Sequence, residues 1–532
     1  MRTRNPLLAR PEQTVPQPSI NVPQYPQMNV PSIDGGMNTI VDPNDLQDNE
    51  QVLINNMVIR NGKMSRRLGV SEIGPTKPNA DPVRKIFTLK QYDGTLVQLR
   101  ITDDTIYRRG VTWVEITDAG GSPLTEGINN LVSTDDRHFF STNGSTVIQE
   151  VNLLADTYAE LGNAPRYKYI TLFDNRIVGF NLVDVGGNNP IQVGWTGTFD
   201  YAEFDPLVNF EAGNAPLEET QSDYTDAGTG IFGFGANLLI VRERSIWLAN
   251  KTGSFQQPFY FYTEVPSLGC DTPKSIQKIP GGIMYYDRRT RSMYVYQIGS
   301  KVPTPIGRQV EDDVYSSISN PDDIFSEFDS INLEYKLGVP QAGTDVTRIW
   351  TYSFKSNAWW YEDRDDVTSI SNLDFGEPSL LIEELVGNIE DLLGNIEDLG
   401  EDDVPSAVTF FGKEDGEIEQ EDVNVVTGYD SEVISKTWTA PQNNDFYVRR
   451  CTFTYDVTVS GSLSIYYSKD NGVTYTLFKT IDFSAMDIGK RLRVVCAKSV
   501  KCTQFSWKIT SSEGIFSLID FKALTEPSGY SV

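Results

Sequence analysis

This sequence repeats short segments of alternating apolar and polar residues, each ended by turn-forming residues, and this repetition limits the folds that the chain can adopt. Residues 85–117 show the pattern most clearly, because Asp93-Gly94, Asp103-Asp104 and Gly110 divide them into four runs of alternating apolar and polar residues. A period of two places alternate side chains on opposite faces of a strand, and Asp-Gly favours a tight turn. Residues 85–117 are therefore predicted to form a four-stranded antiparallel meander.

Comparable units recur at intervals of 30 to 60 residues between about residues 41 and 375. They cover residues 137–151, 167–195, 233–265, 275–298 and 331–363. Radial repetition of such meanders covers the edges of the sheets, so the pattern predicts an all-β fold with a β-propeller of about six blades. A string of β-sandwiches is the alternative architecture.

The N-terminal region, residues 1–40, has a different composition. Residues 1–33 carry seven prolines between isolated apolar residues such as Leu7, Val15 and Tyr25. Because proline lacks an amide donor and fixes φ, this region is predicted to be an extended arm that lies on a neighbouring subunit. A disordered leader is the alternative. The region has no apolar core typical of a signal peptide, and no window of the chain resembles a membrane span, so we expect a soluble protein that is not exported.

Residues 376–422 form an acidic insert with sixteen acidic residues and one base, Lys413. The insert contains the doubled heptad GNIEDLL (387–393) and GNIEDLG (394–400). Leu385, Ile389, Leu392, Ile396 and Leu399 follow one another at spacings of four and three, which predicts a short amphipathic helix or two successive turns. The chain has a formal net charge of −28, and this insert alone contributes −15.

The alternating pattern returns in residues 423–532, which are predicted to form a separate C-terminal β-sandwich of six or more strands. This part has ten acidic and twelve basic residues, so it is nearly neutral. The overall negative charge argues against a partner nucleic acid held through its phosphates. The four cysteines have no spacing typical of a metal site or a disulfide scaffold and fit a chain folded in a reducing cytosol.

Few motifs in the chain point to chemistry. Ser468, Asp470, Gly472 and Tyr475 match the pattern of an Asp-box hairpin, in which the Asp side chain binds turn amides and Gly takes a positive φ. The single histidine, His138, cannot form a catalytic triad or a histidine-rich metal site with a second histidine, and is expected to be an ordinary strand residue. No phosphate-binding loop or nucleophile elbow is present, and Gly233–Gly235 is expected to be a blade turn. We therefore predict no catalytic, cofactor-binding or metal-binding residues, and no cofactor.

Several segments, taken in order, resemble one protein family. They are NNMVIRNGKMSRRLGVSEIG (55–74), LFDNRIVGFN (172–181), VGWTGTFDYAEFDP (193–206), LLIVRERSIWLA (238–249), GCDTPKSIQKIPGGIMYYD (269–287) and TPIGRQVEDDV (304–314). With the doubled GNIEDL and the late YSKDNGVTY hairpin, they resemble the tail nozzle proteins of short-tailed bacteriophages.

This resemblance implies a structural protein of the virion tail and no enzymatic activity. It implies a ring of identical subunits, usually a hexamer, whose lumen continues the DNA ejection channel below the head-to-tail adaptor and helps retain and deliver the genome. The implied partners are the adaptor protein above, tail fibre, spike or needle proteins, and double-stranded DNA in transit only. The protein would be assembled in the cytoplasm of the host bacterium.

The acidic insert supplies the candidate functional residues, because carboxylates that line a channel would repel DNA phosphates and leave the duplex no attachment points. A solvated outer loop is the alternative. The candidates for the channel or a subunit junction are Glu383, Glu384, Glu390, Asp391, Glu397, Asp398, Glu401, Asp402 and Asp403.

Two other functions remain open from the sequence. A propeller-type carbohydrate-binding or glycoside-hydrolysing protein is suggested by the Asp-box and by Trp195, Trp359 and Trp360, if these tryptophans are exposed. Acidic pairs such as Asp312-Asp313 could supply the two carboxylates of a glycosidase, although adjacent acids point in different directions along a strand. A receptor-binding tail protein is the other possibility, but the chain has no long repetitive region typical of such proteins.

Overall fold

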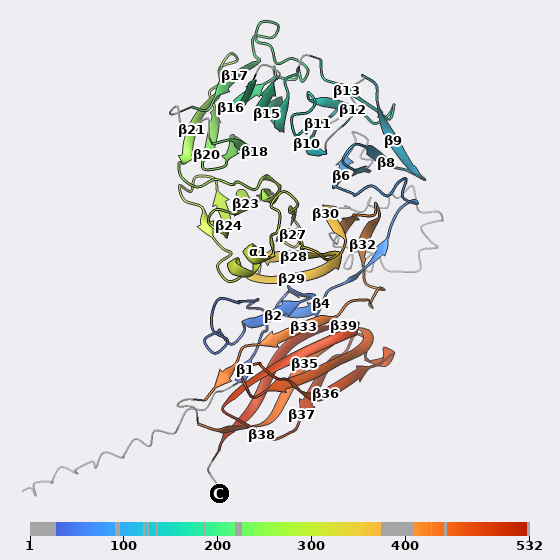
Figure 1. Cartoon of the computed structure of the whole chain (residues 1–532), viewed down its shortest axis with the longest axis vertical. Helices are drawn as coiled ribbons and strands as arrows, with labels where there is room; N and C mark the ends of the chain where they lie inside the picture. The colour runs from blue at the N-terminus through green and yellow to red at the C-terminus, as the bar shows by residue number, and fades with distance from the viewer. Residues whose placement is uncertain are drawn as a thin grey trace, which may run out of the picture.

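The structure is a computed structural model and consists of a β-propeller stacked on a C-terminal β domain (Figure 1). It describes residues 28–90, 96–120, 124, 127–134, 137–162, 164–184, 187–218, 226–373, 408–426, 428–440 and 444–528. Among these residues, helix is limited to α1 (Glu311–Ser317) and short 3-10 turns that include η2 (Pro273–Ser275) and η7 (Ala485–Asp487). The predicted all-β propeller fold is confirmed.

The described residues form seven four-stranded blades. Blades I to III contain β6 (Lys85–Lys90), β7 (Leu96–Ile101), β8 (Ile106–Arg109), β9 (Trp113–Asp118); β10 (Ile128–Ser133), β11 (His138–Thr142), β12 (Gln149–Asn152), β13 (Thr157–Glu160); and β14 (Tyr167–Phe173), β15 (Arg176–Asp184), β16 (Gly187–Trp195), β17 (Gly213–Pro216). Blades IV to VI contain β18 (Gly228–Phe234), β19 (Asn237–Arg242), β20 (Ile246–Lys251), β21 (Phe259–Val265); β22 (Gln277–Ile279), β23 (Gly282–Asp287), β24 (Ser292–Gln297), β25 (Thr304–Pro305); and β26 (Phe325–Asp329), β27 (Glu334–Pro340), β28 (Val346–Ser353), β29 (Ala358–Asp365).

Blade VII is assembled from distant parts of the chain. Strands β30 (Val367–Leu373), β31 (Val408–Lys413) and β32 (Ile418–Asp422) come late in the sequence, and β5 (Gly69–Glu72) comes early. Strand β5 pairs antiparallel with β32, with Glu72 opposite Glu419 and Gly69 opposite Asp422. This pairing closes the propeller ring, so a linear reading of adjacent hairpins does not reveal the seventh blade.

The first strand of each blade lies toward the centre of the propeller. Strand β30 contacts β6 and β26, and β14 contacts β10 and β18, so neighbouring blades meet through their first strands. The cores between blades are apolar; for example, Phe173, Val178 and Phe180 of blade III pack with Leu238 and Ile240 of blade IV. Side chains at the propeller centre therefore come mainly from these first strands.

The C-terminal domain is organised by two long paired strands, β35 (Phe446–Ser468) and β39 (Gln504–Pro527). The other strands attach to this pair or to each other: β1 (Met28–Val30), β2 (Gln51–Asn55), β3 (Met57–Arg60), β4 (Lys63–Arg66), β33 (Ser431–Ser435), β34 (Trp438–Thr439), β36 (Thr476–Phe483), β37 (Arg491–Cys496) and β38 (Val500–Cys502). The first half of β35 pairs with β37 and β38, and its second half pairs with β36. One long hairpin therefore supplies the frame of the whole domain.

Both long strands change register where two glycines meet. A side chain on Gly514, which has φ of +79°, would lie 2.8 Å from the Cα atom of Gly461. Aromatic side chains from the two sides of this point pack against each other. The ring centroids of Phe453 and Trp507 lie 5.5 Å apart, in an edge-on arrangement. The absence of a Cβ at Gly461 and Gly514 permits this close approach of the two backbones.

A continuous sheet joins the propeller to the C-terminal domain. Its strand order runs from blade VI through β29, β2, β33 and β39 to β35 and β36. Asn55 of β2 pairs parallel with Tyr361 of β29, and β2 pairs antiparallel with β33 along its other edge. In Figure 1, β2 and β4 lie between the propeller and the C-terminal strands.

The structure places some predicted boundaries differently. Residues 408–422, predicted as part of the acidic insert, form β31 and β32 of blade VII, because their alternating side chains complete a four-stranded sheet with β30 and β5. Residues 41–68, predicted as propeller, include β2 to β4 of the joining sheet. Residues 1–27 of the predicted arm and the doubled heptad at 387–400 lie outside the described residues.

Candidate functional site

The junction between the two domains contains a buried arginine, Arg66, at the end of β4. Its side chain is 1% exposed. One terminal nitrogen, Nη1, donates to the carbonyl oxygens of Val426 and Gly514 at 2.7 and 2.6 Å, and the other, Nη2, donates to that of Tyr429 at 2.6 Å. Arg66 therefore joins the segment that leads from β32 to β33 with the bend of β39.

The next residue, Arg67, connects the same crossing to blade VI. Its Nε donates to Asn56 Oδ1 at 2.9 Å, and the same oxygen accepts from the amide of Asp363 at 3.0 Å. The Tyr429 ring lies between the two guanidinium groups, 4.1 Å from Arg66 and 3.7 Å from Arg67. The two chain segments that cross between the domains are thus bound to each other by hydrogen bonds and cation–π contacts.

A buried ion pair lies beside this crossing. Arg364 Nη2 is 2.7 Å from Glu362 Oε2 and 3.2 Å from Glu421 Oε1, which joins blades VI and VII. Burial by itself would raise the pKa of Glu362, but the charges of Arg364 and Arg67 outweigh it and lower that pKa. Burial, together with the like charge of Arg364, lowers the pKa of Arg67 to about 10. The junction therefore holds several charges that would be costly to leave unpaired.

The propeller centre holds two opposite charges on first strands, Lys85 of β6 and Glu327 of β26. Lys85 Nζ donates to the carbonyl oxygen of Asn129 at 3.0 Å, and Glu327 Oε1 accepts from the Asn372 amide at 3.5 Å. Burial raises the pKa of Glu327 to about 7, opposed by the charge of Lys85. Burial lowers the pKa of Lys85. Glu327 can therefore exchange a proton near neutral pH.

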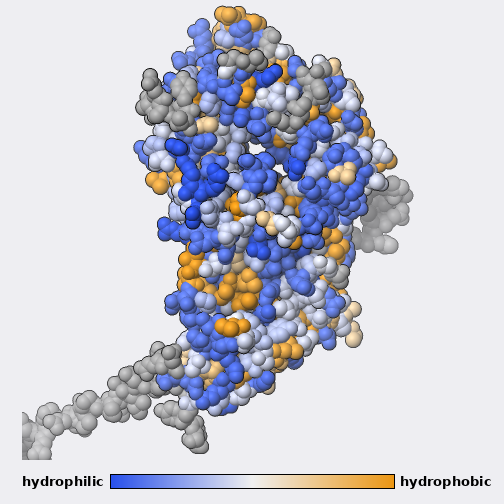
Figure 2. Space-filling view, viewed as in Figure 1, coloured by the Kyte–Doolittle hydropathy of each residue, from blue (hydrophilic) through white to orange (hydrophobic). Residues whose placement is uncertain are grey.

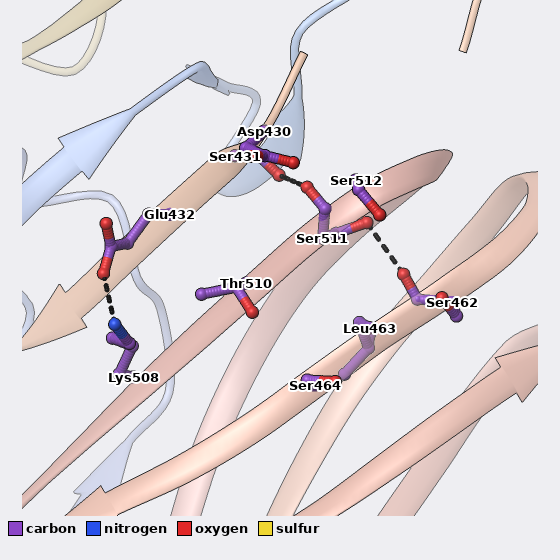
Figure 3. A pocket seen from close by; sticks show the side chains of 10 residues that line it. All are labelled: Asp430, Ser431, Glu432, Ser462, Leu463, Ser464, Lys508, Thr510, Ser511 and Ser512. Atoms are coloured by element: carbon purple, nitrogen blue, oxygen red, sulfur yellow. Dashed lines mark hydrogen bonds and ion pairs between the residues drawn. The ribbon is translucent and has the colours of Figure 1, made fainter. Parts of the chain in front are cut away.

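A polar groove of about 350 Å³ crosses the face of the C-terminal sheet. Its walls come from β33, β35, β39 and Asp430, and Figure 3 labels all ten lining residues. Glu432 and Lys508 form an ion pair at 2.7 Å on one side of the groove. On the other side, Ser511 Oγ donates to the carbonyl oxygen of Ser462 at 2.8 Å. The groove is thus lined mainly by hydroxyl groups and one ion pair.

The predicted Asp-box hairpin lies beside this groove, between β35 and β36. Asp470 Oδ1 accepts from the Thr474 amide at 2.9 Å and from Ser468 Oγ at 2.6 Å, and Gly472 has φ of +81°. The hydrogen bonds from Ser468 and Thr474 lower the pKa of Asp470 to about 2. The hairpin carries Tyr475, whose ring centroid is 5.1 Å from Lys508 Nζ. The expected turn geometry is confirmed, and it positions an aromatic ring against the groove lysine.

Other sequence predictions have mixed outcomes. The nine candidate acids between Glu383 and Asp403 lie outside the described residues. Trp195, Trp359 and Trp360 are 3%, 0% and 0% exposed, so the idea that they are exposed aromatics for sugar binding is wrong. Trp195 lies in the core between blades III and IV, and the adjacent residues Trp359 and Trp360 are both buried because β29 is covered on both of its faces.

The single histidine and the four cysteines are buried in the described chain. His138 is buried in β11, with Nδ1 2.9 Å from Ser133 Oγ. All four cysteines are free and buried, and burial raises the pKa of Cys270 and Cys502 to about 12, so these thiols are poor nucleophiles at neutral pH. The described residues contain no cluster of three or more His, Cys, Asp or Glu side chains suited to a metal ion. No helix in the described parts of the chain is long and apolar enough to cross a membrane.

Sequence reasoning missed both the junction arginines and the groove. Arg66 and Arg67 are adjacent basic residues, a pattern that usually indicates a solvated surface, and the carbonyl oxygens that Arg66 binds lie 360 to 448 positions away. The groove residues lie between positions 430 and 512 and come together only through strand pairing. A usable signal for the groove was the density of Ser and Thr in 460–464 and 510–512.

Comparisons with known proteins give only distant structural likenesses. No family model matches the chain, and no curated protein matches it. Virginiamycin B lyase from Staphylococcus aureus is similar over 66% of this chain and 98% of its own, with 13% identity and a TM-score of 0.39. The extracellular domain of a hybrid two component system from B. thetaiotaomicron covers 80% of this chain and 47% of its own, with 9% identity and a TM-score of 0.39. An exo-beta-1,3-galactanase from Phanerochaete chrysosporium is similar over 85% of this chain and 100% of its own, with 10% identity and a TM-score of 0.27.

Proposed function

We propose that this chain is a structural subunit of a bacteriophage tail, a ring-forming nozzle that continues the DNA ejection channel below the head-to-tail adaptor and supports genome retention and delivery. The observation that carries the proposal is the way in which the two domains are joined. Arg66, Arg67 and Asn56 bind both crossing segments, and one sheet continues from blade VI into the C-terminal domain.

A joint of this kind suits a subunit that must keep its shape while DNA passes under pressure. Domain hinges depend on a few terminal residues that can change φ and ψ freely. Here the two crossings are bound to each other, and Asn56 Nδ2 also donates to the carbonyl oxygen of Asp430 at 2.6 Å. Movement of one domain on the other would expose buried charges, so we expect the subunit to behave as one rigid body.

Exposed apolar side chains on the propeller support assembly into a ring. The segment between β16 and β17 exposes Phe199, Leu207, Val208 and Phe210 at 61% to 93% of their surface. Figure 2 shows apolar side chains at the propeller end of the molecule, away from the C-terminal domain. Contiguous exposed apolar residues are typical of protein–protein contacts, and a neighbouring subunit would cover them in a ring.

The charge distribution supports transit of DNA rather than binding. Residues 376–422 contribute −15 of the net charge of −28. Nine of these acids are the candidates between Glu383 and Asp403; if six subunits place them toward a common lumen, their carboxylates repel the phosphates of the passing duplex. The predicted partners remain the adaptor, tail fibre, spike or needle proteins, and DNA in transit. The proposed location is the virion tail.

The test is the assembly state of the full chain, measured by native mass spectrometry and electron microscopy. We expect a ring with a central hole and a discrete mass, with six subunits as the expected number. Leu207→Asp combined with Phe210→Asp should reduce the ring population strongly, whereas Val473→Asp, at a 78% exposed position on the C-terminal domain, serves as the control. A strictly monomeric chain at all concentrations, with virions that eject DNA normally without it, would contradict the proposal.

A second measurement addresses the nine candidate acids. Replacing Glu383, Glu384 and the other seven with their amides should slow DNA ejection from virions if they line the lumen. The control neutralises exposed propeller acids such as Asp104 and Asp365. Unchanged ejection kinetics in the first variant would favour an outer position for the segment.

A further inference from the structure

The groove on the C-terminal sheet has hydrogen-bonding capacity that the protein itself does not use. The hydroxyl groups of Thr510 and Ser512 lie in its lining, and neither hydroxyl is hydrogen-bonded to another of the described residues. Ser464 Oγ is bonded only to another hydroxyl, that of Thr480, at 3.1 Å. A hydroxyl can donate once and accept twice, so these groups retain free donors and acceptors.

These groups form a row that crosses four strands. Glu432 of β33 is opposite Thr510 of β39, Thr510 is opposite Ser464 of β35, and Ser464 is opposite Thr480 of β36. Adjacent strands lie about 4.8 Å apart, so the row presents polar groups at a regular interval. A linear ligand with hydroxyl groups repeated along its length can contact several of them together.

One end of the groove offers an ionic and aromatic corner. Lys508 precedes Thr510 by two residues on the same face of β39, and its Nζ lies over the rings of Tyr475 and Tyr466 at 5.1 and 5.7 Å. Glu432 and Lys508 retain 31% and 24% exposure of their side chains, so both can still reach a ligand. Tyrosine rings beside polar groups suit a ligand with both hydroxyl groups and apolar C–H faces.

The charge of the groove argues against anionic ligands. Lys508 is paired with Glu432, while Asp430 lines the groove and Glu513 accepts from Ser462 Oγ at 3.3 Å. The lining therefore carries more negative than positive charge, which disfavours phosphates, nucleic acids and sulfated polymers.

We propose that this groove is a binding site for neutral oligosaccharide chains. The sugar hydroxyls donate to the Glu432 carboxylate and to Ser464 and accept from Thr510 and Lys508, and a ring face packs near Tyr475. The site binds sugars and does not hydrolyse them. The carboxylate nearest the hydroxyl row is that of Glu432, and it is already paired with Lys508. The inference is independent of ring assembly, because every contributing residue belongs to one chain.

The experiment uses the full chain and an array of neutral glucans, mannans, galactans and xylans of four to eight sugars, followed by calorimetric titration of the best binder. We expect Thr510→Val combined with Ser464→Ala to weaken binding by about tenfold or more, since each lost hydrogen bond is worth up to about tenfold. Thr458→Val, at an exposed position of the same strand β35 outside the groove, should change the affinity less than about twofold. A sulfated form of the same oligosaccharide should bind more weakly.

Three results would overturn the site. They are the absence of binding to every neutral oligosaccharide at millimolar concentration, equal binding by the groove and control variants, and tighter binding of the sulfated form. If the double variant fails to fold, Lys508→Met tests the same site from its ionic end, and loss of binding with an unchanged unfolding midpoint supports it. Native mass spectrometry of each variant separates loss of sugar binding from loss of ring assembly.

Discussion

The propeller and the C-terminal domain build β-structure in opposite ways. Blade I uses strands of four to six residues joined by local turns. In the C-terminal domain, most strands instead pair with β35 and β39, which are 23 and 24 residues long. In blades I to VI, each strand pairs with its sequence neighbour, so the pairing is local. In the C-terminal domain, β39 pairs with β1, β4, β33, β34 and β35, so residues from both ends of the chain must be present before it is complete. We therefore expect the propeller to be stabilised mainly by local pairing and the C-terminal domain by pairing between distant segments.

The largest expected effect comes from removing the arginine that joins the two regions. Arg66→Ala leaves the carbonyl oxygens of Val426, Tyr429 and Gly514 without this donor in a buried site. Its cost should be at least about 3 kcal/mol in the free energy of unfolding. Urea unfolding followed by tryptophan fluorescence should change from one transition to two, because the domains lose their coupling.

The control for this prediction is Arg491→Ala. Arg491 pairs with Asp456 on the surface, and its side chain is 62% exposed. Such exposed pairs contribute at most about 1 kcal/mol. An equal cost for the two variants, or two separate transitions in the unmodified protein, would show that the junction does not couple the domains.

The second prediction concerns the bend of the long hairpin. Gly514→Ala should cost about 3 kcal/mol, because a Cβ there would lie 2.8 Å from Gly461 Cα and φ is +79°. Gly299→Ala is the matched control in the propeller, since its φ is +90° but no atom lies within 4 Å of the added Cβ. It should cost about 1 kcal/mol. Thermal unfolding of both variants measures the difference in their free energies of unfolding. Equal costs would mean that the close approach of β35 and β39 at this bend does not require glycine.

The third prediction tests the propeller centre through pH. The pKa of Glu327 is about 7 in the folded protein, above the ordinary value of 4.5. The folded state therefore binds this proton more tightly, and the protein loses stability as pH rises from 4.5 to about 7. Glu327→Gln removes that loss and should stabilise the protein at pH 8 by on the order of 1–3 kcal/mol. Denaturant midpoints between pH 5 and 8 check it, and a difference that does not vary with pH would contradict it.

The smallest effect is expected at the Asp-box hairpin. Asp470→Ala removes the acceptor of the Thr474 amide, so hydrogen exchange of that amide should become faster while the blades are unchanged. Ser468→Ala is the paired control, because its Oγ accepts from the Gly472 amide at 3.0 Å and should affect that amide in the same way. Uniform acceleration across the domain in either variant would mean that the hairpin stabilises more than its own turn.

The hairpins of the propeller could be predicted because their signals are local. Turn residues such as Asp103-Asp104 and Gly110 separate alternating runs, and the structure places strands on either side of them as predicted. The seventh blade could not, because β5 and β32 lie about 350 residues apart and neither contains a sign of its partner. The same applies to the candidate groove, whose polar row exists only after four strands have paired.

Four properties could be inferred from the sequence alone: the all-β class, the propeller meanders, the Asp-box turn and the concentration of negative charge in residues 376–422. These follow from side-chain period, turn chemistry and composition, which are properties of neighbouring residues. Three further properties emerge in the folded chain: how the ring closes, where Arg66 and Arg67 bind, and the burial of Trp195, Trp359 and Trp360. Those outcomes depend on which distant segments pair, because each carbonyl, ring or hydroxyl involved contacts a residue that is remote in the chain.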